Sequence, residues 1–270
     1  MQDSKPQDAQ KSATLTDNLE AAINGQVPLR VGDVLQRSWD ITLRALPMML
    51  LGLVVLMIVN VIVSTLGQAL FPVDEMELQN HMGNFAAQNI LGIIVLAPFT
   101  AVLTVMALQN ARDGKAKLNA FGRAFQCAPQ IIAISVISTT VVVIAAVILG
   151  LLFDIGGTFV ALLVLVAIYI QFSFLLAAPL VLERSMKVSR AITASFLMTN
   201  SRMLPILGIY LILSVIVFIS ALPLLLGLLF TIPMSFNVIG VIYNRLVGVE
   251  QLEPQADSAT EQLESESSTE

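Results

Sequence analysis

The chain has 270 residues, of which 56% are apolar and only 12% are charged. Soluble domains carry about 25% charged residues, so this composition and a mean hydropathy of +0.84 indicate an integral membrane protein. A single cysteine, Cys127, excludes a secreted scaffold held by disulfides. The formal net charge of -5 argues against nucleic-acid binding.

Both ends of the chain are polar. Residues 1–30 contain no apolar stretch of the kind found in a cleavable signal peptide. The C-terminal residues are rich in Glu and contain no Lys or Arg after Arg245. Segments of such composition cannot bury enough apolar surface to become ordered. We therefore expect a disordered arm over residues 1–30 and a disordered acidic tail over residues 246–270, with partner binding by the tail as the alternative.

Between these ends, most of the sequence is apolar enough to cross a membrane, which takes about 20 residues per helix. Spans are predicted at 46–66, 90–108, 131–153, 158–180, 203–221 and 224–243. The last two come from one uncharged stretch, in which Ala221-Leu222-Pro223 is the expected turn. One span followed by a re-entrant or interfacial helix is the alternative there. The predicted fold is an all-α polytopic membrane protein with six transmembrane helices.

The positive charges indicate how the chain is oriented. With six spans, all 14 Lys and Arg residues lie on one side of the membrane. The positive-inside rule then places that side, and both termini, in the cytoplasm. An odd number of spans would put Arg245 on the opposite side directly after a helix, which favours six.

Amphipathic segments precede the first, third and fifth spans. Each has a small residue, then an aromatic residue, then a proline near the membrane boundary: Ser38-Trp39 before Pro47, Ala124-Phe125 before Pro129, and Ser195-Phe196 before Pro205. Proline is tolerated in the first turn of a helix. The pattern predicts three cytoplasmic interfacial helices, each followed by a transmembrane hairpin. The alternative is that any transition from a loop into a membrane helix looks amphipathic.

A longer pattern suggests a family. Residues 171–207 read QFSFLLAAPLVLERSMKVSRAITASFLMTNSRMLPIL, in which an Ala-Pro-Leu-Val-Leu helix end runs into Glu183-Arg184 and a basic amphipathic helix. Together with residues 33–75, this segment resembles the YciC-type inner-membrane proteins of Gram-negative bacteria, and the resemblance covers residues 33–245. The chain is also distantly similar to the membrane domain of some glycerophosphodiester phosphodiesterases. The resemblance implies a six-span protein of the bacterial inner membrane, and it supplies no catalytic residues.

Two sets of residues are candidates for function. Each basic residue near an anionic leaflet contributes about 1 kcal/mol of attraction. The basic cytoplasmic segments are therefore predicted to contact lipid. The alternative is that their charges only orient the chain in the membrane. The predicted lipid-contacting residues are Arg37, Trp39, Arg44, Lys117, Arg123, Lys187, Arg190 and Arg202. Asn60, Gln171 and Asn237 are polar residues within the spans, where they either form interhelical hydrogen bonds or line a substrate path.

The predicted spans contain no ionisable residue, whereas ion-coupled transport generally uses one. His81 is the single histidine, so neither a Ser-His triad nor a His-based metal site is expected. We therefore expect no enzymatic activity, metal or cofactor. The leading hypothesis is a protein that contributes to envelope or membrane organisation through contacts with lipids or protein partners. The alternative is a transporter or channel-like carrier of an uncharged or lipidic substrate, not coupled to protons, with Asn60, Gln171 or Asn237 lining a midplane opening.

Overall fold

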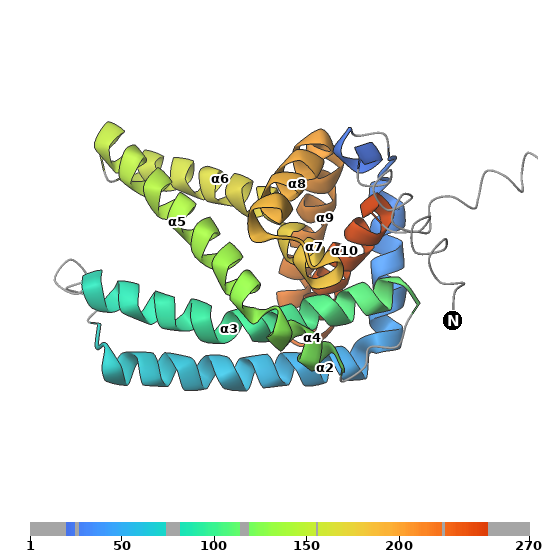
Figure 1. The fold of residues 1–270 in the computed structure, drawn as a ribbon, viewed down its shortest axis with the longest axis horizontal. Helices are drawn as coiled ribbons and strands as arrows, with labels where there is room; N and C mark the ends of the chain where they lie inside the picture. The colour runs from blue at the N-terminus through green and yellow to red at the C-terminus, as the bar shows by residue number, and fades with distance from the viewer. Residues whose placement is uncertain are drawn as a thin grey trace, which may run out of the picture.

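The computed structural model describes residues 20–24, 27–73, 82–113, 119–154, 156–222 and 225–247, whose regular structure is helical throughout (Figure 1). The helices are α2 (Val31–Leu70), α3 (Met82–Ala111), α4 (Asn119–Gln126), α5 (Ala128–Leu152), α6 (Gly157–Ser173), α7 (Ala177–Arg184), α8 (Val188–Ser201), α9 (Met203–Ala221) and α10 (Leu228–Val247). The predicted acidic tail, residues 246–270, lies outside the described residues after Val247.

Five helical segments of the described residues have the length and composition needed to cross a membrane: Val31–Leu70, Met82–Ala111, Ala128–Leu152, Gly157–Arg184 and Met203–Ala221. They overlap the first five predicted spans. The sixth is the exception, because α10 is not among the five and begins four residues later than predicted. Its polar residues lower its mean hydropathy, and much of its surface is buried by other helices rather than left for lipid.

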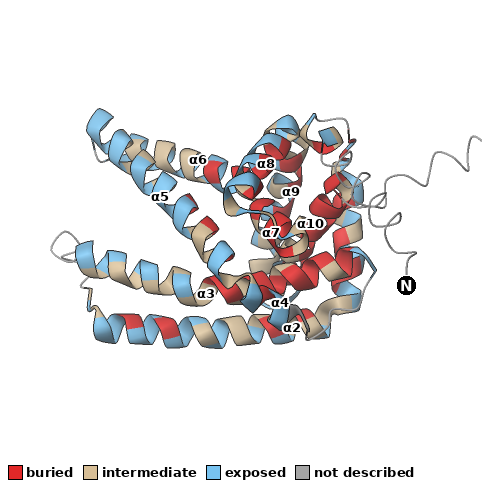
Figure 2. Ribbon diagram, viewed as in Figure 1, coloured by how far each residue is buried: buried red, intermediate tan, exposed pale blue. Residues whose placement is uncertain are grey.

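The apolar side chains of the long helices face outward. Leu151 and Leu204 are each 81% exposed and Met57 is 67% exposed. Buried residues are concentrated where α10 meets α2 and α3, while the far ends of α2, α3, α5 and α6 are mostly exposed or intermediate (Figure 2). An apolar exterior over five long helices is the arrangement that lipid requires. The protein is therefore a multi-pass membrane protein.

The first interfacial helix is continuous with the first span. α2 runs through 40 residues with Pro47 inside it, in place of the separate helix and span that the sequence predicted. Proline removes one backbone hydrogen bond and clashes with the preceding turn, so it bends a helix that it does not end. Accordingly, the N-terminal part of α2 stands at a steep angle to the remainder (Figure 1).

The other two amphipathic segments form separate helices. α4 ends at Gln126 and α5 starts at Ala128, with Pro129 in its first turn. α8 ends at Ser201 and α9 starts at Met203, with Pro205 in its first turn. The prediction of helix, break and proline-containing first turn is confirmed at both places.

The fourth predicted span is broken rather than continuous. α6 ends at Ser173 and α7 begins at Ala177, because Pro179 has no N–H to donate to the carbonyl of Leu175. Buried Ser195 of α8 bridges the break: its hydroxyl accepts from the Leu176 N–H at 3.0 Å and donates to the Ser173 carbonyl at 2.8 Å. Backbone groups freed at membrane depth need such partners.

Helix α10 packs centrally against α2 and α3. At Gly240 of α10, an added Cβ would lie 2.4 Å from the carbonyl oxygen of Ala107 in α3. At Gly52 of α2, it would lie 2.8 Å from the Leu103 side chain. Small residues at these points let the helices approach closely, as membrane helices commonly do.

The last described residues of the N-terminal arm, 20–24 and 27–30, pack against the helices. Disorder was predicted for residues 1–30, yet Ala22, Val27 and Leu29 are buried. Ser201 donates a hydrogen bond to the Ala22 carbonyl at 3.1 Å. Apolar side chains at these few positions supply the contacts, although the mean composition of the arm is polar.

Candidate functional site

A group of buried polar side chains, which we name the polar core, joins α2, α3 and α10. Asn237 Nδ2 donates to Thr42 Oγ1 at 2.9 Å, and Asn237 Oδ1 accepts from Asn110 Nδ2 at 3.3 Å. Thr42 in turn donates to the Ser38 carbonyl at 2.6 Å. Asn237 and Thr42 are fully buried and Asn110 is 3% exposed. The polar core therefore fixes how the three central helices meet.

Of the three intramembrane polar candidates, only Asn237 takes part in this network. Asn60 lies exposed on α2 and Gln171 lies exposed on α6. The structure does not bring the three together, so the opening that they were predicted to line is not formed by them. Sequence reasoning missed Asn110, although a polar residue in the last turn of a long apolar helix is a usable signal.

A second group of side chains lies where α10 ends, and we name it the charged collar. Its members are Asp33, Arg37, Arg44, Arg112, Asp113, Arg123, Glu183, Arg184 and Arg245. Asp113 follows α3 and accepts from Arg37 at 2.5 Å and from Arg44 at 2.7 Å. The hydrogen bonds from Arg44 and Arg37 lower the pKa of the Asp113 carboxyl below its ordinary value, so the contact is charged at neutral pH.

Most of the remaining contacts of the collar lie at the C-terminal ends of helices. Arg123 donates to the carbonyls of Leu182, at 2.5 Å, and Glu183, at 2.9 Å, near the end of α7. Arg184 donates to the Val247 carbonyl of α10 at 3.0 Å. Arginine at these positions satisfies terminal carbonyls and offsets the negative end of the helix dipole. Arg112 pairs with Glu183, and Arg245 with Asp33 at 3.5 Å.

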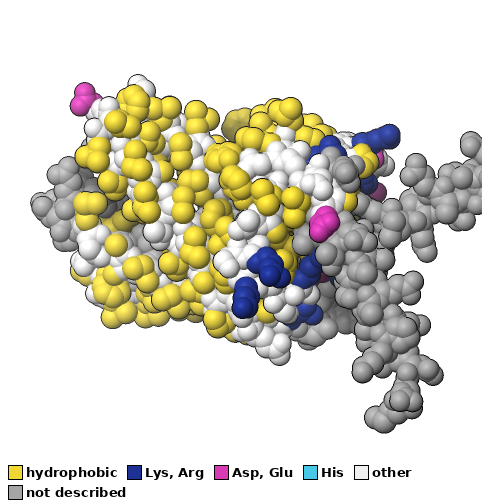
Figure 3. Space-filling model, turned by 45° about the horizontal axis from the view of Figure 1, so that its top comes forward, with side chains coloured by type: hydrophobic (Ala, Val, Ile, Leu, Met, Phe, Trp, Pro, Cys, Tyr) yellow, Lys and Arg dark blue, Asp and Glu magenta, His cyan; other side chains and the backbone are white. Residues whose placement is uncertain are grey.

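These contacts place the basic residues of the collar at one end of the molecule. The start of α2 and the ends of α3, α7 and α10 all meet in the collar. In Figure 3, Lys and Arg side chains gather toward one end, while hydrophobic side chains cover the other part of the visible face. Arg245 therefore shares an end with Arg37 and Arg112.

The predicted lipid-contacting residues lie in different environments. Arg37, Arg44 and Arg123 are bound within the collar. Arg202 is half-buried between α8 and α9, and Lys117 lies outside the described residues. Lys187, Arg190 and Trp39 are exposed. These three remain available to a membrane surface.

Trp39, 40% exposed on the N-terminal part of α2, gives a direct test of that placement. If this part of α2 lies at the interface, headgroup-depth lipid quenchers should reduce Trp39 fluorescence, and aqueous iodide should have little effect. Trp39 is the single tryptophan, so the unmodified protein in vesicles suffices. Strong iodide quenching would instead show a helix free in water.

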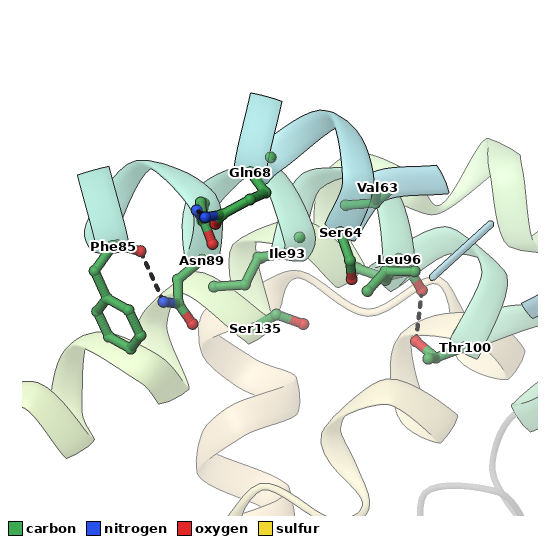
Figure 4. Close-up of a pocket in the computed structure, with 13 residues that line it drawn as sticks. Val63, Ser64, Gln68, Phe85, Asn89, Ile93, Leu96, Thr100 and Ser135 are labelled. Carbon is green, nitrogen blue, oxygen red and sulfur yellow. Dashed lines mark hydrogen bonds between the residues drawn. The ribbon is translucent and has the colours of Figure 1, made fainter. Parts of the chain in front are cut away.

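A pocket of about 670 Å³ opens between α2, α3 and α5, away from the collar (Figure 4). We name it the lateral pocket. Its lining residues are Val63, Ser64, Gly67, Gln68, Phe85, Gln88, Asn89, Gly92, Ile93, Leu96, Ala97, Thr100 and Ser135. None of these is charged. Sequence reasoning missed this site, although Ser64 and Gln68, four residues apart, share one face of α2.

Amide side chains connect α2 to α3 at one end of the lateral pocket. Gln88 Nε2 lies 2.9 Å from Gln68 Oε1 and 2.6 Å from the Phe71 carbonyl, and so donates from α3 to α2. Asn89 Nδ2 donates to the Phe85 carbonyl at 2.8 Å. Ile93, Leu96 and Ala97 continue the wall with apolar side chains. The α3 side of the lining therefore combines an amide-bearing turn at Gln88 and Asn89 with an apolar stretch at Ile93, Leu96 and Ala97.

Within the described residues, no group of three His, Cys, Asp or Glu side chains lies close enough to hold a metal ion. Comparison of the whole chain with protein-family models, curated proteins and solved structures finds no match. The polar core, the charged collar, the apolar exterior and the lateral pocket are the features that bear on function.

Proposed function

We propose that this is a non-enzymatic protein of a bacterial inner membrane that contributes to membrane or envelope organisation through contacts with lipids or protein partners. One observation carries the proposal: charged residues gather at one end of a bundle whose long helices expose apolar side chains. The ion pairs and hydrogen bonds of the collar hold the helix ends together, so these charges have a structural role. The exposed residues Trp39, Lys187 and Arg190 are suited to anionic headgroups.

The proposal includes membership of the YciC-type family and a six-passage topology with both termini in the cytoplasm. The family assignment is supported by the sequence pattern of residues 171–207. The topology is supported by Arg245, which pairs with Asp33 at the start of α2. In this topology α10 passes through the bundle beside α2 and α3, so its polar residues meet protein rather than lipid.

Reporter fusions test the topology. Because the basic residues share one end, reporters placed after Glu250 or within 112–117 should behave as cytoplasmic, and a periplasmic reporter within 72–88 should be active. A reporter after Arg30 serves as the internal reference for the cytoplasmic side. A periplasmic C-terminus would contradict the six-passage topology and favour five.

The lateral pocket favours a second candidate, a carrier of an uncharged or lipidic substrate. With uncharged lining residues, such transport should be passive. In liposomes with an imposed pH gradient, small uncharged solutes should equilibrate without uphill accumulation. Uphill accumulation of a solute that a protonophore abolishes would contradict passive transport. Proton-coupled transport would then become the leading function.

A further inference from the structure

The lateral pocket has features that point to a particular class of ligand. It is bounded by three helices whose neighbouring apolar side chains are exposed, including Ile62 at 51% and Ile90 at 55%. In a membrane, such surroundings are lipid. A volume of about 670 Å³ falls within the range of ordinary ligand sites, and the side of the pocket leaves room for a longer chain to continue into the bilayer.

Hydrogen-bonding groups remain available in the pocket. Ser64 and Ser135 make no hydrogen bond within the described residues, and Figure 4 shows both hydroxyl groups directed into the same space. In contrast, the hydroxyl groups of Thr65 and Ser173 each donate a hydrogen bond to the backbone carbonyl four residues earlier. Asn89 uses its amide N–H on Phe85, which leaves its side-chain oxygen as an acceptor. Unpaired polar groups in an apolar medium are costly, so a ligand that bonds them is favoured.

The charge of the lining restricts the headgroup. None of the lining residues is Lys or Arg, so a phosphate drawn into the pocket would lose water without gaining a cationic partner. Serine hydroxyls both donate and accept, and the Asn89 oxygen accepts. This combination matches an alcohol group, which also both donates and accepts. The apolar stretch formed by Ile93 and Leu96 matches an acyl chain.

We propose that the lateral pocket binds a neutral, hydroxyl-bearing glycerolipid of the diacylglycerol type. Its alcohol group lies near Ser64, Asn89 and Ser135, and one acyl chain runs along Ile93 and Leu96. This inference rests on the proposed role in lipid contacts and names the lipid class for one site.

The test uses the full chain in phosphatidylethanolamine–phosphatidylglycerol vesicles that contain a diacylglycerol with a diazirine in one acyl chain. After irradiation, mass spectrometry of peptides should show saturable labelling of residues 63–100, displaced by unlabelled diacylglycerol. Phosphatidic acid with the same chains should displace it about tenfold less effectively, since it brings a charge that the pocket does not neutralise. Equal displacement by phosphatidic acid would overturn the assignment of a neutral headgroup.

Matched variants locate the site. Ser135→Trp fills the pocket and should abolish saturable labelling. Val136→Trp adds the same side chain one residue away, at an exposed position of α5 outside the lining, and should retain it. Ser64→Ala with Ser135→Ala keeps the space and removes two hydroxyls, which should weaken binding about tenfold. Melting curves for each variant show that the fold is intact.

Two failures are distinguishable. Unchanged labelling in Ser135→Trp, or non-saturable labelling spread over α5, α6 and α9, would overturn this site while leaving general lipid contact supported. Absence of labelling from every exposed apolar helix surface would contradict the proposed function itself.

Discussion

Gly240→Ala is expected to destabilise the protein strongly. The new Cβ would lie 2.4 Å from the oxygen and 2.7 Å from the carbon of the Ala107 carbonyl, and neither backbone atom can rotate away. α3 and α10 would have to separate, at a cost of about 1–3 kcal/mol, which is typical of overpacking. The polar core would be strained as well, because Asn237 of α10 reaches Asn110 of α3.

The unfolding free energy in a denaturing detergent titration measures this effect. Gly208→Ala is the matched control, because its Cβ would meet Val31 Cγ2 at an ordinary 3.5 Å. Replacement of a helical glycine there should leave stability unchanged or raise it by up to about 1 kcal/mol. Equal stability of Gly240→Ala and Gly208→Ala would show that α3 and α10 do not approach as closely as described.

Asn237→Leu is expected to have the next largest effect. An average hydrogen bond in a membrane protein contributes only about 0.6 kcal/mol, so residue type alone predicts mild effects at Asn60, Gln171 and Asn237 alike. Burial separates them: Asn237 is fully buried and bonds two partners. Its replacement leaves Asn110 with an unpaired amide in the core, which costs about 1–3 kcal/mol.

Asn60→Leu provides the comparison, since it places an apolar side chain at an exposed position of a long apolar helix and should be neutral or stabilising. The double variant Asn110→Leu with Asn237→Leu should lose less stability than the sum of the two single variants, because no buried amide is left without its partner. Additive losses would show that the two side chains do not interact. Detergent unfolding monitored by Trp39 fluorescence reports all of these variants.

An all-helical, multi-pass membrane protein could be predicted from hydropathy alone, and five of the predicted spans overlap long helices of the structure. Hydropathy over about 20 residues is a local property, so no knowledge of packing is needed. The breaks before α5 and α9 were also predictable, because Pro129 and Pro205 act on the turn in which they occur.

Which polar residues are buried and hydrogen-bonded depends on the packing of the helices. The sequence singled out Asn237 but gave no reason to separate it from Asn60 and Gln171, because burial depends on which helix faces which. The same dependence explains the polar residues of α10. They lower its hydropathy, and they pack against α2 and α3 rather than facing lipid.

Two prolines have effects on the helices that the local sequence did not predict. Pro47 bends α2, although the sequence analysis placed it near the start of a span. Pro179 separates α6 from α7, although it fell within the predicted span 158–180. The break at Pro179 is sustained by Ser195, 16 residues later in the chain, which bonds the freed backbone groups. The lateral pocket and the charged collar likewise join residues from distant segments. Only the packing of the helices brings such groups within hydrogen-bond distance.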